Sequence, residues 1–167
     1  FFQAEDGIRA VERSRGLGDV YKRQTVAVAE SCTGGFLGHH ITAIPGASAV
    51  FVGGIISYSN ELKHKQLDVK NDTLEKHGAV SKAVALEMAE GARAATGADH
   101  TLSVTGIAGP GGGSTEKPVG TVWLGLASAG ERPLAVKKHH PYNRETFKQA
   151  SVNQSLELLR RRIQRDR

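Results

Sequence analysis

Hydrophobic and polar positions along the first half of the chain alternate between a strand pattern and a helix pattern. Residues 25–30 (TVAVAE) are a short β-rich run, and apolar residues at helical spacing follow over 36–44. Residues 49–59 (AVFVGGIISYS) predict a buried strand whose two adjacent glycines mark a bulge or a close backbone approach. A helix is then expected to start near Asn60.

The second half of the chain predicts two well-delimited helices around a hairpin. Ser81 is a good N-cap for a helix over 82–96, Gly97 stands just past its end, and Asn143 caps a last helix. Between these helices the patterns predict strands at 100–106, 119–128 and 134–140, with a Gly/Pro loop at 107–118 and a turn at 129–133. The alternating order predicts a layered α/β domain, and the late hairpin predicts a mixed sheet.

The first 24 residues differ from the rest, because they show no sustained apolar period and end abruptly at Gln24. They resemble translated sequencing-adapter read-through, and we interpret residues 1–24 as a non-native or disordered extension. A genuine N-terminal extension is the alternative; the artefact interpretation implies that a native first helix is missing. The remainder predicts a single domain over residues 25–164 and a basic tail at 165–167.

Charge and composition narrow the class of protein. The net charge is +5, yet residues 25–159 hold twelve Lys and Arg against twelve Asp and Glu, whereas the last eight residues hold five Arg and one Asp. A basic helix end with few aromatic residues in the chain argues against a nucleic-acid partner. No apolar run approaches the roughly 18 to 20 residues that span a bilayer, which argues against a membrane partner. The single cysteine fits a cytoplasmic location.

A turn between the first strand and the first helix offers a nucleophile. Ser31 lies where its hydroxyl can project from the edge of the sheet, and the amides of Thr33, Gly34 and Gly35 open the helix. Those amides could hold an oxyanion or a phosphate. Alternatively, Ser31 or Thr33 is an ordinary N-cap, and spacing alone leaves both interpretations open.

Lysine is a better candidate base than histidine, because no Ser-His-Asp arrangement stands at comparable positions. Lys63 follows Asn60 by three residues, so both could face the same way from the first helical turn. Partial burial would lower the pKa of Lys63 and free a neutral amine, with Tyr58 relaying or orienting the proton. The alternative is that Lys63 is a solvated surface residue.

A glycine-rich segment, SVTGIAGPGGG from Ser103, follows a later strand. Its amides could form a nest for an anionic group while the Thr105 hydroxyl contacts the reaction centre, although a flexible surface loop has the same composition. It lacks the Gly-Lys-Ser/Thr ending of a Walker loop. Arg144, at the start of the last helix, could add a guanidinium to a phosphate site or be a solvated helix end.

The histidines do not predict a metal site. Adjacent pairs, such as the one at 139–140, point to different sides of a helix or strand, and no cysteine cluster supports them. His77 is assigned to a turn. We therefore expect neither a metal nor a cofactor.

The motifs AESCTGG, GGIISYSNELK, HGAVS, TGIAGPGGG and EKPVGTVW, in this order, closely resemble the CinA C-terminal domain family. The resemblance covers residues 25–163. That family includes the nicotinamide-nucleotide amidases, so it implies a three-layer α/β/α domain with a mixed, mostly parallel sheet, commonly a homodimer. It also implies hydrolysis of nicotinamide mononucleotide to nicotinic acid mononucleotide and ammonia without a cofactor.

The resemblance assigns roles residue by residue. It makes Ser31 the acylated nucleophile, Lys63 its base and Tyr58 a proton-handling partner. It also lines the substrate cleft with residues of the TGIAGPGGG motif, which are Thr105, Gly106, Gly109, Gly111 and Gly112. We place the phosphate near the helix-start amides or Arg144, where the residues Tyr142-Asn143 depart from the family's usual Gly-Asp. A non-catalytic nucleotide-binding module, or an amidase for another small amide, remains an alternative.

Overall fold

The computed structural model describes residues 24–165 of the chain. The extension predicted at residues 1–24 lies outside the described residues except for Gln24, and so do residues 166–167 of the predicted tail. In chain order the elements are β1 (Val26–Glu30), α2 (Phe36–Thr42), the 3-10 turn η2 (Ala47–Ala49), β2 (Phe51–Ile56), α3 (Asn60–Leu67), α4 (Asn71–His77), α5 (Lys82–Thr96), β3 (His100–Gly106), β4 (Thr121–Ser128), β5 (Leu134–His139) and α6 (Arg144–Arg165).

The strands form one mixed sheet in the order β2-β1-β3-β4-β5. The pairs β1–β2 and β1–β3 are parallel, whereas β3–β4 and β4–β5 are antiparallel. Strand β4 therefore runs against the other four strands of this sheet, which all point the same way. The α/β class and the mixed, mostly parallel sheet are confirmed.

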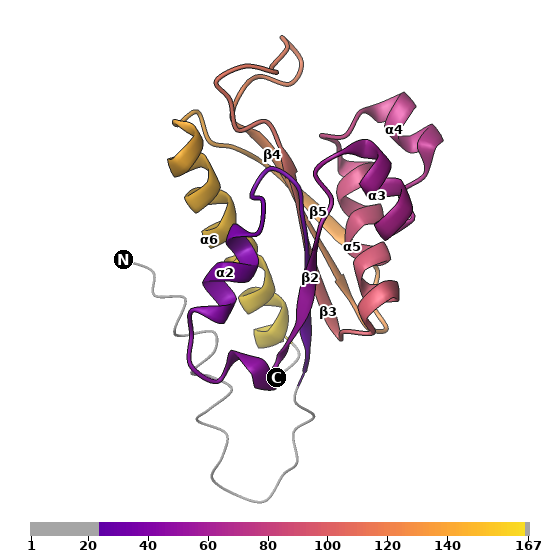
Figure 1. Ribbon diagram of the computed structural model, residues 1–167, viewed down its shortest axis with the longest axis vertical. Coiled ribbons are helices and arrows are strands. Elements are labelled where there is room, and N and C mark those ends of the chain that lie inside the picture. The colour runs from indigo at the N-terminus through magenta and orange to yellow at the C-terminus, as the bar shows by residue number, and fades with distance from the viewer. Residues whose placement is uncertain (1–23, 166–167) are drawn as a thin grey trace, which may run out of the picture.

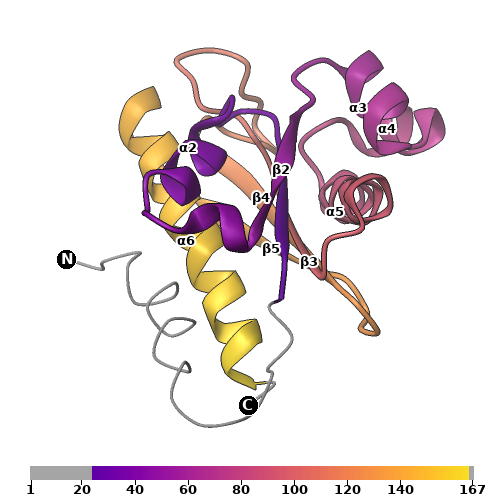
Figure 2. The same cartoon turned by 60° about the horizontal axis from the view of Figure 1, so that its bottom comes forward.

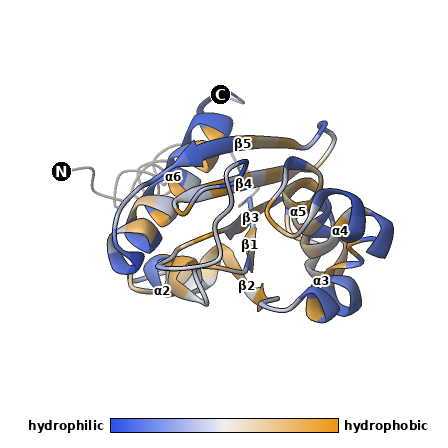
Figure 3. Cartoon of the chain, turned by 90° about the horizontal axis from the view of Figure 1, so that it is seen from above, coloured by the Kyte–Doolittle hydropathy of each residue, from blue (hydrophilic) through white to orange (hydrophobic). Residues whose placement is uncertain are grey.

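Helices cover both faces of this sheet and make the three predicted layers (Figures 1 and 2). Helices α2 and α6 lie on one face, and α3, α4 and α5 lie on the other. Seen from above, the helices turn blue, hydrophilic surfaces outward and orange surfaces toward the strands (Figure 3). Each face has its own apolar core, one beneath α2 and α6 and a smaller one beneath α3, α4 and α5.

Strand β2 differs from its prediction, because it lies at an edge of the sheet and alternates between half-buried and exposed residues. The expectation of a buried strand over 49–59 is wrong in this respect. The expected bulge is confirmed: Val26 faces Phe51 and Ala27 faces Gly53, so Val52 is the extra residue.

The helices with capping residues in the sequence were predicted correctly, and a helix without a side-chain cap was missed. Ser81 caps α5 by accepting a hydrogen bond from the Val84 amide, and Gly97 ends this helix in the left-handed conformation, as expected. The side chain of Asn143 accepts from the Thr146 amide at the start of α6, which confirms that cap. Helix α4 was not predicted, and His77 is its last residue rather than part of a turn.

Helix α5 packs unusually close to its neighbours. A Cβ on Gly91 would lie 1.8 Å from the Leu67 carbonyl oxygen at the end of α3. On the sheet side, buried hydroxyls of β3 donate hydrogen bonds to main-chain carbonyls: Thr101 to Ala89 at 2.6 Å, Ser103 to Ala85 at 2.5 Å and Thr105 to Ala79 at 2.9 Å. The position of α3, which packs on α5, is thus fixed relative to the end of β3.

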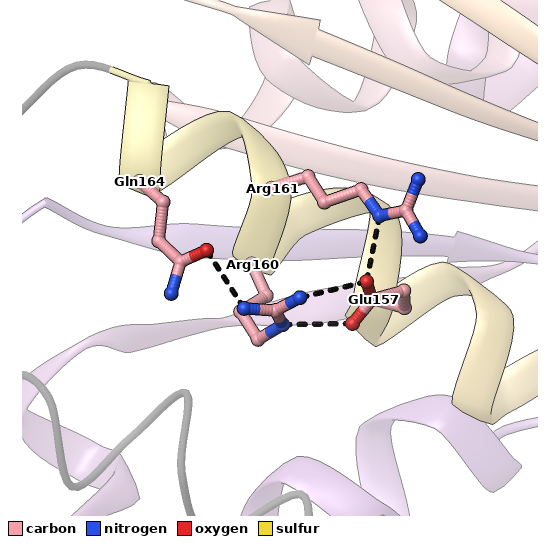
Figure 4. A network of polar contacts seen from close by, with 4 residues as sticks. All are labelled: Glu157, Arg160, Arg161 and Gln164. Atoms are coloured by element: carbon pink, nitrogen blue, oxygen red, sulfur yellow. Dashed lines mark hydrogen bonds and ion pairs between the residues drawn. The ribbon is translucent and has the colours of Figure 1, made fainter.

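Four of the five arginines among the last eight residues lie in helix α6, which ends at Arg165. Both Arg160 and Arg161 bind Glu157, and Arg160 also donates to Gln164 (Figure 4). Hydrogen bonds from Arg160, aided by Arg161, lower the pKa of Glu157 to about 2 despite some desolvation.

Farther along α6, Arg162 is 4% exposed and paired with Glu131 of the β4–β5 turn. Arg162 is therefore not solvated, whereas the side chains of Arg161 and Arg165 are 73% and 70% exposed. Within residues 24–165 no helix is long and apolar enough to cross a bilayer.

Candidate active site

Ser31 follows β1 directly, at the edge of the sheet where the parallel strands end. Its amide donates to the Val104 carbonyl at 3.0 Å, while the Ser57 amide donates to the Glu30 carbonyl at 2.8 Å. The hydrogen bonding of the sheet thus continues past β1 on both sides. Ser31 is only 8% exposed, so its position is fixed by the two neighbouring strands.

Lys63 reaches Ser31 from helix α3, which begins after the Ser59 cap. Its Nζ lies 3.0 Å from the Ser31 Oγ, 2.7 Å from the Ser57 carbonyl oxygen and 3.2 Å from the Tyr58 carbonyl oxygen. The side chain is 1% exposed, and this desolvation lowers the pKa of Lys63 from 10.5 to about 8. The interpretation of Lys63 as a solvated surface residue is wrong.

The contacts of Lys63 suit a base. A neutral amine has two N–H groups and one lone pair, and the carbonyls of Ser57 and Tyr58 can take both N–H groups. The lone pair then faces the Ser31 hydroxyl. With a pKa of about 8, roughly a quarter of the amines are neutral at pH 7.5, against about 0.1% for an ordinary lysine.

The start of helix α2 is not open to a substrate anion. The carboxylate of Glu30 accepts the amides of Gly35 and Leu37 at 3.0 Å and of Gly38 at 2.8 Å, and the Gly34 amide donates to the Ser31 carbonyl. The prediction that the Gly34 and Gly35 amides hold an oxyanion or phosphate is therefore wrong in this conformation, because both already have acceptors.

The alternative of an ordinary N-cap is wrong too. The residue that precedes α2 is Gly35, which has a φ of 97° and gives no side-chain cap. Thr33 is fully buried, and its hydroxyl has no hydrogen-bond partner among residues 24–165. Neither the Ser31 nor the Thr33 side chain caps the N-terminus of this helix.

Tyr58 contacts the site differently from its prediction. Its main-chain carbonyl accepts from Lys63, but its side chain is 59% exposed and its hydroxyl accepts a 3.0 Å hydrogen bond from Arg144. Arg144 also donates to the Gly109 carbonyl at 3.0 Å. The guanidinium therefore joins the segment after β2, the β3–β4 loop and the start of α6, and the phenol is directed to Arg144 rather than to Lys63.

The TGIAGPGGG motif contains residues that are fixed by packing and residues that are open to a ligand. Thr105 is buried and its hydroxyl proton goes to Ala79, so toward the site this hydroxyl can act only as an acceptor. A Cβ on Gly106 would lie 2.8 Å from the Thr121 carbonyl oxygen, so packing alone requires that glycine.

In the loop that follows, only one of the three predicted glycines is required by packing. A Cβ on Gly109 would lie 2.5 Å from Val119 Cγ1, whereas Gly111 has nothing within 4 Å of that position and Gly112 has only Ile107, at 3.8 Å. Gly111 and Gly112 are exposed. They are the members of the predicted glycine set where a ligand could approach the main chain.

Cys32, next to Ser31, is not a competing nucleophile. Burial raises the pKa of its thiol to about 12, although Lys63 and Arg144 both act to lower it. The thiolate is therefore scarce near neutral pH. The influence of both cations on Cys32 also shows that they act on the same turn. Within residues 24–165 no group of three or more His, Cys, Asp or Glu side chains could hold a metal ion.

The sequence pattern by itself indicates no role for Glu30 in the site. Its position in AESCTGG indicates the end of a strand, yet its carboxylate organises the turn that carries Ser31. An acidic residue just before a tight turn that leads into a helix is a recognisable signal, because helix-start amides attract negative charge.

Together these features define a three-layer α/β domain with a buried serine–lysine pair at the carboxyl edge of its sheet. The chain belongs to the CinA C-terminal domain family, whose sequence model matches residues 14–163. This match begins inside the segment interpreted above as a non-native extension.

Individual relatives agree with the family assignment. A CinA-like protein of Parasynechococcus marenigrum is 51% identical over 141 residues, which are 84% of this chain and 34% of that protein. A CinA-like protein of Leptospira borgpetersenii is 46% identical over 144 residues, or 86% of this chain and 34% of that protein. The chain thus spans about a third of the length of these curated relatives.

Solved structures share the fold over nearly their whole length. The competence/damage inducible protein CihA of Agrobacterium tumefaciens has a TM-score of 0.84 and 39% identity, covering 93% of this chain and 92% of its own. The competence damage-inducible protein A of Klebsiella pneumoniae has a TM-score of 0.85 and 31% identity, covering 96% of each chain.

Proposed function

We propose that this domain is an amidohydrolase that converts nicotinamide mononucleotide to nicotinic acid mononucleotide and ammonia through an acyl-enzyme on Ser31. The observation that carries the proposal is the 3.0 Å contact between the Ser31 hydroxyl and the buried amine of Lys63. A serine becomes a nucleophile when a neighbouring base accepts its proton, and a desolvated lysine is such a base. The substrate itself is taken from the resemblance to the nicotinamide-nucleotide amidases.

The reaction needs one nucleophile and one proton carrier. Ser31 Oγ forms a bond to the carboxamide carbon as its proton moves to the Lys63 Nζ. The C–N bond then breaks, and Nζ returns the proton to the nitrogen, which leaves as ammonia. Water attacks the resulting ester and gives a proton to Nζ. Finally the ester C–O bond breaks, Ser31 Oγ takes that proton back, and the acid product leaves.

Arg144 is our candidate for the phosphate contact. Its guanidinium is exposed and has five N–H donors, of which one goes to Tyr58 and one to Gly109. The remaining donors suit a phosphate, which arginine can bind through two parallel hydrogen bonds. Two of the three helix-start amides that form the alternative already have acceptors within the chain. In this proposal Tyr58 orients Arg144 and does not carry the proton.

Ammonia release from nicotinamide mononucleotide tests the proposal. Ser31→Ala and Lys63→Met should each lower kcat about a thousandfold or more, because nucleophile and base act as a unit. Ser48→Ala and Lys65→Met are matched controls, since both side chains are exposed, and they should keep the parent rate. Unchanged turnover by Ser31→Ala would overturn the proposal.

Two further measurements separate the alternatives. Binding of the nucleotide without any ammonia release by the parent protein would instead support a non-catalytic binding module. Equal rates on nicotinamide, its riboside and its mononucleotide would show that the phosphate is not recognised and would point to another small amide.

The acyl-enzyme can also be detected directly. We expect mass spectrometry of acid-quenched protein to find the peptide that contains Ser31 heavier by the mass of the acyl group.

A further inference from the structure

Glu30 is a buried carboxylate that directly precedes Ser31. It is 1% exposed, and its two oxygens accept the amides of Gly35, Leu37 and Gly38 at 2.8 to 3.0 Å. These acceptors complete the first turn of α2, where amide donors have no partner within the helix. Hydrogen bonds to a charged oxygen are about twice as strong as neutral ones.

These bonds fix both ends of the turn that carries the nucleophile. Glu30 belongs to β1, and its own carbonyl accepts from Ser57, so its main chain is part of the sheet. Its carboxylate binds the start of α2 on the other side of the turn. Between these anchors Gly34 and Gly35 have φ values of 61° and 97°, which other residues rarely adopt. Such a turn keeps its shape only if both ends are held.

We infer that Glu30 is a positioning residue, which holds the Ser31 hydroxyl at hydrogen-bond distance from Lys63 by joining the end of β1 to the start of α2. This inference rests on the proposed function for the reaction that it assists. Glu30 does not touch the reacting atoms; it acts through the turn. Displacement of a nucleophile by about 1 Å can slow a reaction about a hundredfold.

Glu30→Gln tests the inference with almost no change in size. The glutamine oxygen can still accept from part of the turn, but its NH2 group faces an amide donor where Glu30 offers an acceptor. We expect kcat to fall about 10- to 100-fold while KM changes less than about threefold. The rise of the rate with pH should keep its midpoint near pH 8, because Lys63 keeps its own partners.

Glu87→Gln is the matched control, because Glu87 also accepts hydrogen bonds at the start of a helix, from the Lys70 amide and the Thr73 hydroxyl. It lies in α5, away from the Ser31 turn, so it should lower stability without lowering kcat. A parent-like kcat in Glu30→Gln would overturn the inference. Equal losses of kcat in the two variants would overturn it too, because they would reflect general destabilisation.

A reagent independent of the substrate separates this inference from the proposed function. A fluorophosphonate probe should label Ser31 about tenfold more slowly in Glu30→Gln than in the parent, whether or not nicotinamide mononucleotide is a substrate. Equal labelling rates in folded proteins would refute positioning. If circular dichroism shows that the glutamine variant does not fold, Glu30→Asp serves instead, and a parent-like labelling rate there would refute it.

Discussion

The buried ammonium group of Lys63 should make the fold less stable at neutral pH, and replacing it with methionine should remove that penalty. Burial lowers the pKa of Lys63 from 10.5 to about 8. At 1.36 kcal/mol for each pH unit, this change corresponds to about 3 kcal/mol in the free energy of unfolding. Such a penalty is a large part of the 5 to 15 kcal/mol that typically stabilises a domain.

The sign follows from which state binds more protons. Because the folded pKa lies below the unfolded one, the unfolded chain binds more protons between about pH 8 and 10.5. The penalty is complete below pH 8 and disappears as the pH rises through that window. Cys32 acts in the opposite direction, since burial raises its pKa from 9.0 to about 12 and the folded chain then loses stability above pH 9.

Urea denaturation of the parent and of Lys63→Met, at pH 7, 8, 9, 10 and 10.5, isolates the lysine. The free energy of unfolding of Lys63→Met minus that of the parent should fall by about 3 kcal/mol from pH 7 to 10.5. Cys32 is present in both proteins, so its contribution to this difference largely cancels. The lost hydrogen bonds to the Ser57 and Tyr58 carbonyls change the difference by an amount that does not depend on pH. Lys65→Met, on an exposed turn of the same helix, provides the control.

A difference between parent and Lys63→Met that does not vary with pH would refute the reasoning. It would mean that the Lys63 amine is as well solvated in the folded chain as in the unfolded one. The same result would remove the basis for a neutral amine near pH 7.5. The rate of ammonia release gives an independent check, since it should rise about tenfold per pH unit below pH 8 as the base loses its proton.

Three stability variants test the packing around the site and the helix end. Gly91→Ala should cost about 1 to 3 kcal/mol in urea denaturation, because its Cβ would meet the Leu67 carbonyl oxygen, and a loss below about 0.5 kcal/mol would show that α3 and α5 separate easily. Gly111→Ala, in open space, should change stability by less than about 0.5 kcal/mol by the same measurement. Glu131→Ala should cost about 1 to 3 kcal/mol and lower the Tm, because it leaves the Arg162 guanidinium buried without its partner; an unchanged Tm would contradict that account.

The parts of the fold that could be predicted are those with local causes. The α5 helix has both of its caps in the sequence, at Ser81 and Gly97, and its boundaries matched the expectation. Helix α4 has no side-chain cap at its start and buries only Leu74, so its seven residues carry little signal. Its position depends on packing against α5, which no short pattern records.

In the site, too, the residues with local signals could be predicted and those with distant partners could not. The sequence placed Ser31 and Lys63 correctly at the ends of neighbouring elements, because strand–turn–helix order brings such residues to one edge of the sheet. It could not place the phenol of Tyr58, whose partner Arg144 is 86 residues away. It also assigned three amides before α2 to a ligand, although those of Gly34 and Gly35 already donate to acceptors within the chain.

The hydroxyl groups along β3 have a geometric consequence for the site. Thr101 and Ser103 are two residues apart on a strand, a rise of about 6.6 Å, and their acceptors Ala89 and Ala85 are four residues apart on α5, a rise of about 6.0 Å. Because the two spacings nearly coincide, both bonds form at one alignment, and a slip by one residue would break both. The residue spacing of β3 therefore sets the position of α5 along the sheet. Because α3 packs on α5, this alignment also sets the distance between α3 and Ser31.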